Sequence, residues 1–155
     1  MREIKHQTQP TGLACIATCL AMLVGRRAEF VDAEFTPKYV KQQGDVPMFL
    51  AMWGIRCIPQ VTAGIHQLHN GKLYLACVPS LMMAGMFHQV IIDTREGRVE
   101  VYDPGMGYSK KTQYYVPPDS LKLQQDNAFY DNLAFPLRTW ILDYELEILE
   151  DGEQS

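Results

Sequence analysis

The chain lacks any long apolar run, and this absence bears on where the protein is expected to be found. A transmembrane helix needs about 18 or more consecutive apolar residues, and no segment of the sequence approaches that length. The opening residues MREIKHQTQP carry charges, but they have no apolar h-region directly behind those charges, so we expect no secretory signal peptide. A cytoplasmic protein without a membrane span is the resulting expectation.

The sequence also lacks the patterns of nucleic-acid binding and of cysteine-based metal sites. Its net charge is −4, and its lysines and arginines form no basic stripe interleaved with aromatic residues. Its four cysteines include no Cys-x-x-Cys pair, which excludes a zinc ribbon or a thioredoxin-type motif. His66 and His69 have a metal-ligand spacing, but no carboxylate or thiol stands near them, so we interpret them as surface histidines. We expect no metal, no cofactor and no nucleic-acid partner.

What is present is the composition of an ordinary globular domain. Apolar residues make up 47% of the 155 positions and charged residues 21%, so we expect a single domain over residues 1–155. From Asp143 onward there are six acidic residues and no lysine or arginine. We interpret this segment as a solvated last strand and an acidic end that is frayed after about residue 150.

Helices are expected first along the chain. Residues 13–24 are apolar or small at most positions and are followed by Gly25, which predicts a buried helix. A second helix is predicted within residues 28–43, where Pro37 breaks it or starts a new one, and a third near 46–53.

Strands are expected after the helices. The segments with strand patterning are 55–61, 72–81, 88–93 and 98–103. The last two flank TREG, which predicts a β-hairpin. Residues 137–149 have the composition of an edge strand, although their spacing also fits a helix. The fold class is therefore α+β, with N-terminal helices packed on an antiparallel β-sheet.

Cys15 is the one cysteine whose position favours reactivity. A thiol attacks only as its thiolate, and an ordinary thiol with a pKa of about 8.5 is mostly protonated at neutral pH. Cys15 lies in the first turn of the first predicted helix, where unpaired N–H groups carry partial positive charge. Cys19 lies one turn deeper, and Cys57 and Cys77 lie inside predicted strands. We predict Cys15 as a nucleophile, with a buried helix cysteine as the simpler alternative.

The predicted hairpin supplies partners for this thiol. His88 begins its first strand and Asp103 ends its second, so the two residues are expected side by side. A carboxylate in that place holds the ring and stabilises the imidazolium. The side-chain amide of Gln9 and the backbone N–H of Cys15 are suitable donors to an oxyanion. Gln9, Cys15, His88 and Asp103 thus form one candidate acyl-transfer site.

These pieces resemble the papain-like cysteine peptidases, and among them the C39-type domains of bacteriocin-processing transporters. The matching stretches are QPTGLAC, CIATCLAMLVG, FHQVII and VEVYDPGMG, and the resemblance covers about residues 7 to 107. It implies a papain-like α+β fold with Cys15 as nucleophile, His88 as base, Asp103 as orienting residue and Gln9 in the oxyanion hole. It also implies a cysteine peptidase that cleaves a peptide or isopeptide-type amide bond in a protein or peptide substrate. We expect this peptidase to be stand-alone, because no transporter or ATPase segment follows the matched region.

Two other functions stay open. The same site serves a deamidase, a transglutaminase or an acyltransferase, because all of these pass through a thioester. Ile16-Ala17 follow the nucleophile where the family usually has glycine and then a small residue or proline. A bulky Ile16 either narrows the cleft or marks a catalytically silent module that only binds a peptide.

Overall fold

Three helices precede all the strands in the computed structural model, which describes residues 2–108, 113–115 and 134–149. The helices are α1 (Cys15–Val24), α2 (Ala28–Val40) and α3 (Val46–Ala51). The strands are β1 (Ile55–Pro59), β2 (Leu73–Pro79), β3 (Phe87–Asp93), β4 (Glu100–Tyr102), β5 (Gln113–Tyr115), β6 (Ala134–Pro136) and β7 (Ile141–Ile148). This order confirms the α+β class. The acidic end predicted to fray after residue 150 lies outside the described residues.

α1 is the buried helix that the sequence predicts, but it begins at Cys15 rather than at residue 13. Residues 17–24 are all buried, and Gly25 ends the helix with a φ of 72°, a left-handed conformation that favours glycine. Leu13 lies before the helix and is 86% exposed. Cys15 is therefore the first helical residue.

α2 continues past Pro37, where the sequence predicts an interruption. A proline in a helix interior removes a hydrogen bond and crowds the preceding turn. Pro37 lies near the end of α2, which stops at Val40, and residues 37–40 are exposed. The cost of the proline is therefore confined to the last turn. α3 is short and is capped by the preceding residue, Asp45, whose side chain accepts a hydrogen bond from the Met48 N–H.

The main sheet has the strand order β1-β7-β2-β3-β4, and all its neighbouring strands are antiparallel. β7 lies between β1 and β2, so the prediction of an edge strand for this segment is wrong. The charged residues of β7 are paired with neighbouring strands, Glu145 with Lys72 beside β2 and Glu147 with Arg56 of β1. Such cross-strand ion pairs make charges compatible with an interior strand.

β7 contains a β-bulge at Asp143. Tyr144 pairs with Leu75, whereas Leu142 pairs with the next residue of β2, Ala76, so Asp143 has no partner of its own on β2. Leu142 and Leu146 would share one face of a regular strand. Instead, Leu146 packs in the core under the helices and Leu142 in a second core on the other face. The bulge therefore redirects the side chains of this part of β7.

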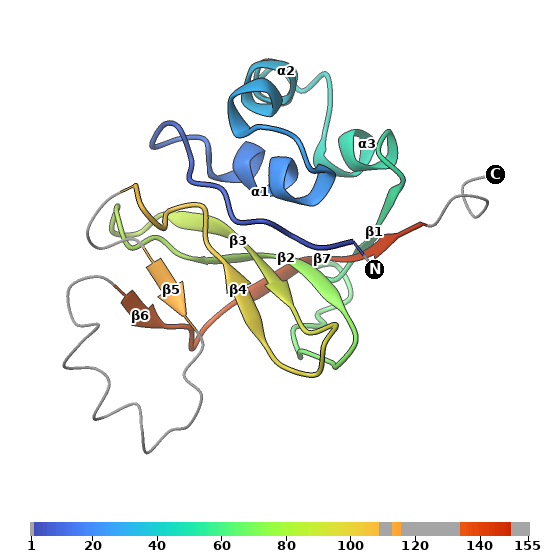
Figure 1. Ribbon diagram of the computed structural model, residues 1–155, viewed down its shortest axis with the longest axis vertical. Helices are drawn as coiled ribbons and strands as arrows, with labels where there is room; N and C mark the ends of the chain where they lie inside the picture. The colour runs from blue at the N-terminus through green and yellow to red at the C-terminus, as the bar shows by residue number, and fades with distance from the viewer. Residues whose placement is uncertain (1, 109–112, 116–133, 150–155) are drawn as a thin grey trace.

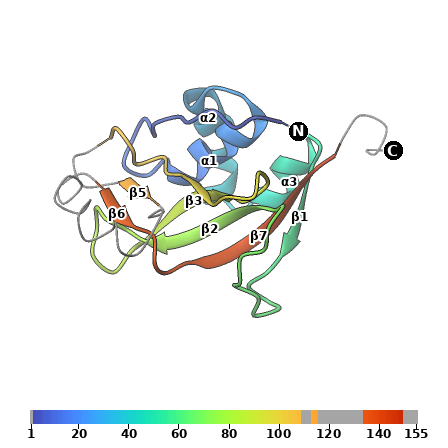
Figure 2. The same ribbon diagram turned by 60° about the horizontal axis from the view of Figure 1, so that its bottom comes forward.

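The helices cover one face of the main sheet, as both ribbon views show (Figures 1 and 2). The core between the two layers includes Leu20 and Leu23 of α1, Phe49 of α3, Leu75 of β2 and Ile91 of β3. Within the described part of the chain, no helix has the length and apolar character needed to cross a bilayer.

The N-terminal segment connects the two layers. Arg2 donates a hydrogen bond to the carbonyl oxygen of Leu23, at the end of α1. The backbone N–H of Gln9 donates to the carbonyl oxygen of Pro104, just beyond β4, at 2.8 Å. This segment therefore runs beside both the helices and the sheet before it enters α1 (Figure 1).

β3 extends beyond its partner β4, and part of its edge is left for other contacts. The pairing confirms the predicted hairpin, but β4 pairs only with residues 91–93, whereas β3 begins at Phe87. α1 lies against the remaining edge, where Cys19 Sγ donates to the carbonyl oxygen of Gln89 at 3.4 Å. The unequal lengths of the two hairpin strands create the place where the helix meets the sheet.

Candidate active site

Cys15 lies at a helix end that has no side-chain cap. Ala14 precedes it without a capping hydrogen bond, and the first turn of α1 contains no acidic residue. The N–H groups of this turn are therefore left for other partners, and they bring partial positive charge to the thiol. The Cys15 side chain is only half-buried, so a reagent or substrate can approach it.

Backbone donors on the helix and on the sheet both face this thiol. The N–H groups of Ile16 and of Gln89 form hydrogen bonds to Cys15. Cys19 bonds the carbonyl oxygen of the same Gln89. Because residues four apart lie on one face of a helix, the two cysteines fix α1 against a single residue of β3.

His88 and Asp103 are in contact, as the hairpin geometry predicts. His88 Nε2 and Asp103 Oδ1 are 2.6 Å apart, and both side chains are buried. The backbone N–H groups of Gly105 and Tyr114 also donate to the Asp103 carboxylate, at 2.7 and 2.8 Å. Since Nε2 is bonded to the carboxylate, the other ring nitrogen, Nδ1, is the one left to bond Cys15.

The surroundings of the pair favour the charged form of both groups. Burial raises the pKa of the Cys15 thiol, but hydrogen bonds from His88 and from the Gln89 backbone, with the charge of His88, lower it below its ordinary value. Burial lowers the pKa of His88, but its hydrogen bonds to Asp103 and Cys15 raise it to about 9. A lowered thiol pKa beside a raised imidazole pKa is typical of a thiolate–imidazolium pair.

The other three thiols have the opposite character. Burial raises the pKa of Cys19 well above its ordinary value and that of Cys57 to about 11. Burial and a hydrogen bond to Asp143 raise the pKa of Cys77 to about 12. All four cysteines are unpaired thiols, and Cys15 alone among them has a lowered pKa.

Gln9 lies next to the site with a buried and incompletely bonded amide. Its side chain is 1% exposed, and Nε2 donates to the carbonyl oxygen of Thr11 at 2.7 Å. This contact uses one of the two amide N–H groups. The second N–H and the Oε1 atom have no hydrogen-bond partner in the described part of the chain. A buried amide with unsatisfied donor and acceptor atoms lowers the stability of the fold unless a ligand or another group forms hydrogen bonds with them.

Ile16, which stands where C39-type domains usually have glycine, is half-buried. Its side chain packs against the core between the helices and the sheet. It contributes to the docking of α1, and its backbone N–H is one of the donors to Cys15.

Sequence reasoning missed Gln89, Cys77 and Asp143, which lie together on the sheet next to Cys15. Cys77 pairs with Gln89 across β2 and β3. Gln89 Nε2 and Cys77 Sγ donate to Asp143 Oδ2 at 3.0 and 3.1 Å. The available signal was Gln89 itself, because a polar side chain inside the apolar stretch HQVIID needs hydrogen-bond partners when it is buried.

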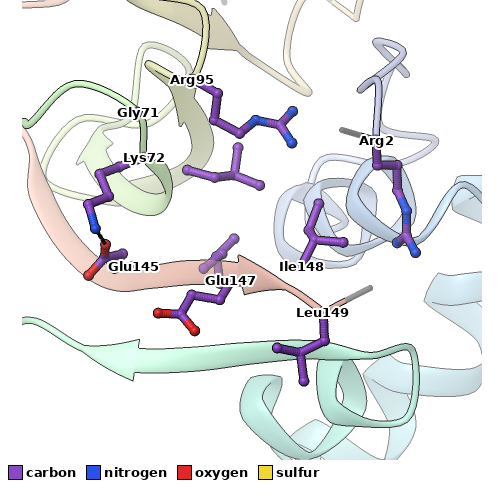
Figure 3. Close-up of a pocket in the computed structure, with 10 residues that line it drawn as sticks. Arg2, Gly71, Lys72, Arg95, Glu145, Glu147, Ile148 and Leu149 are labelled. Atoms are coloured by element: carbon purple, nitrogen blue, oxygen red, sulfur yellow. Dashed lines mark ion pairs between the residues drawn. The ribbon is translucent and has the colours of Figure 1, made fainter. Parts of the chain in front are cut away.

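A cavity of about 370 Å³ lies at the opposite end of the sheet (Figure 3). Gly71 and Lys72, which line it, precede β2, whereas His88 pairs with Val78 near the end of that strand. Its charged groups have partners: Lys72 Nζ lies 2.6 Å from Glu145, and Arg95 pairs with Asp93 beside the cavity. We assign no chemistry to it.

The described residues contain no group of three or more His, Cys, Asp or Glu side chains that is able to hold a metal ion. His66, one of the two histidines with metal-ligand spacing, has a structural contact instead. Its Nδ1 accepts a hydrogen bond from the Leu142 N–H at 3.2 Å.

Comparison with known proteins found no family model, no curated protein and no solved structure that matches the chain.

Proposed function

We propose that the chain is a cysteine peptidase that cleaves a peptide or isopeptide-type amide bond through a thioester on Cys15. The observation that carries this proposal is the hydrogen-bonded series Cys15–His88–Asp103, with the thiol at an uncapped helix end. The fold we propose is papain-like, in keeping with the motifs that resemble C39-type domains. The proposed compartment is the cytoplasm, where thiols remain reduced.

Acylation begins with attack of the Cys15 thiolate on the carbonyl carbon of the substrate amide. The carbonyl oxygen becomes an oxyanion, which receives hydrogen bonds from the free N–H of the Gln9 amide and from the Cys15 backbone. The His88 imidazolium gives its Nδ1 proton to the amine as the C–N bond breaks, and a thioester remains. Asp103 keeps the Nε2 proton in place and fixes the orientation of the ring.

Hydrolysis of the thioester uses the same groups. Neutral His88 takes a proton from water, and the water oxygen attacks the thioester carbonyl. The C–S bond then breaks, the acid product leaves, and the thiolate–imidazolium pair is restored.

Reaction with 4-nitrophenyl acetate tests this proposal without knowledge of the substrate. Peptide mass spectrometry should find an acetyl group on Cys15 that forms faster than on Cys57 and is then lost by hydrolysis. His88→Ala should slow both steps. Acetylation of Cys15 no faster than of Cys57, which has a raised pKa, would contradict the proposal.

The products formed from a peptide mixture by the wild-type protein, but not by Cys15→Ala, identify the class of reaction. New peptide N-termini that require Cys15 identify a peptidase. Release of ammonia from glutamine, or incorporation of a labelled amine, identifies a deamidase or a transglutaminase in its place. Peptide binding without any thioester identifies the silent module.

A further inference from the structure

We infer that Asp143 is a specificity-determining residue that binds a cationic side chain of the substrate, a lysine ammonium or an arginine guanidinium, next to Cys15. The inference rests on the proposed function, because the thiol that defines the site is the same. Neither the sequence pattern nor the resemblance assigns a role to this residue.

The β-bulge brings the Asp143 carboxylate to the site. Because Asp143 is the extra residue of the bulge, its side chain is free of the regular alternation along β7. Asp143 Oδ2 accepts hydrogen bonds from Gln89 Nε2 and Cys77 Sγ, at 3.0 and 3.1 Å. Gln89 is also the residue whose backbone N–H bonds Cys15. Gln89 therefore contacts both the Asp143 carboxylate, through its side chain, and the Cys15 nucleophile, through its backbone.

The second oxygen of this carboxylate is available to a ligand. Asp143 Oδ1 has no hydrogen-bond or ion-pair partner among the described residues. It is also not among the fully buried side-chain atoms of the described residues that lack a hydrogen-bond partner. An oxygen that is neither bonded nor buried is open to solvent, so Oδ1 can accept a hydrogen bond from a substrate.

Asp143 differs in charge pairing from the other acidic residues of β7. Glu145 is paired with Lys72 and Glu147 with Arg56, whereas no cation in the described part of the chain pairs with Asp143. Its neighbour Cys77 stays a neutral donor, because burial and Asp143 raise the pKa of that thiol to about 12. A half-buried carboxylate with neutral neighbours attracts a cation, and a basic substrate side chain supplies one.

The test uses two thiol reagents that differ in charge. The 2-aminoethyl and 2-sulfonatoethyl methanethiosulfonates each form a mixed disulfide with a thiolate and release methanesulfinate, and one is cationic and the other anionic. Peptide mass spectrometry gives the rate of each reaction at Cys15. We expect Asp143→Asn to lower the ratio of the cationic to the anionic rate about 25-fold, because one unit charge about 4 Å away in a water-like medium changes each rate about fivefold and in opposite directions.

A matched control separates a local effect from a change in net charge. Glu147→Gln removes the same charge from the same strand, at the end that borders the cavity in Figure 3. It should leave the ratio as in wild type, and Asp143→Glu should keep most of the preference. Asp143→Ser serves as a second neutral variant in case Asp143→Asn does not fold.

The outcomes separate the inference from the proposed function. An unchanged ratio in the neutral variants at position 143, or an equal fall in Glu147→Gln, would overturn the role of Asp143. The rate with the uncharged methyl methanethiosulfonate reports the thiolate itself. If Cys15 reacts with it no faster than Cys57 does, the proposed function fails instead. A purely structural role for Asp143 would change all three rates together and leave the ratio constant.

Discussion

The substitution Asp103→Asn tests how strongly one buried carboxylate controls His88. Oδ1 of Asp103 bonds His88 Nε2 and the Gly105 N–H, and Oδ2 accepts from the Tyr114 N–H. Asparagine keeps one acceptor oxygen but replaces the other with an NH₂ group. Whichever way the amide turns, at least one N–H donor then faces another donor, and the negative charge is lost.

The pKa of His88 measures the size of the effect. Burial lowers this pKa, yet hydrogen bonds to Asp103 and Cys15 raise it from 6.5 to about 9. That rise corresponds to roughly 3 kcal/mol in favour of the imidazolium. With the Asp103 charge removed and the thiol absent, only the effect of burial remains, so we expect the pKa of His88 to fall below 6.5.

Titration of the His88 ring by NMR in a Cys15→Ala background gives this value directly. The pKa should lie above 6.5 when Asp103 is present and below 6.5 in the double variant with Asp103→Asn. Asp93→Asn is the control, because it removes another buried carboxylate, at the far end of β3, where it pairs with Arg95. A His88 pKa that does not change with Asp103→Asn would refute the argument that this carboxylate stabilises the imidazolium.

Three further predictions concern the pH profile, the oxyanion donor and the core. Amide cleavage should fall as the pH rises through about 9, because His88 then loses the proton that the leaving amine needs, and a plateau to higher pH would argue against that role. Gln9→Ala should slow acylation by 4-nitrophenyl acetate about 100-fold but leave iodoacetamide alkylation of Cys15 unchanged, and equal losses in both would point to a structural defect. Leu20→Ala should lower the free energy of unfolding in urea by about 2–5 kcal/mol, since Leu20 is fully buried, and a loss under about 1 kcal/mol would contradict its place in the core.

The sequence predicts those features that depend on local pattern. The apolar character of residues 13–24 on all sides predicts a buried helix, and TREG between two alternating segments predicts the hairpin. Because hairpin pairing follows from the turn, the contact between His88 and Asp103 is predictable as well.

Features that depend on distant pairing are not predictable in this way. Alternation shows that residues 141–148 can form a strand, but it does not show that β7 inserts between β1 and β2. The bulge at Asp143 results from the register between β7 and β2, which are far apart in the sequence. The backbone of Gln89 can bond Cys15 and Cys19 only because β4 is shorter than β3 and leaves that part of the β3 edge unpaired. No local pattern of either segment specifies this difference in length.

The rate of iodoacetamide alkylation at Cys15 as a function of pH, in wild type and in His88→Ala, tests the thiolate–imidazolium pair most directly. Peptide mass spectrometry resolves Cys15 from Cys57 and Cys77 in the same sample, and these thiols serve as internal references with raised pKa values. The account predicts that Cys15 titrates below the ordinary thiol pKa in wild type and that its pKa rises in His88→Ala, where burial acts without the imidazolium. A Cys15 that reacts like an ordinary or buried thiol in both proteins would contradict it.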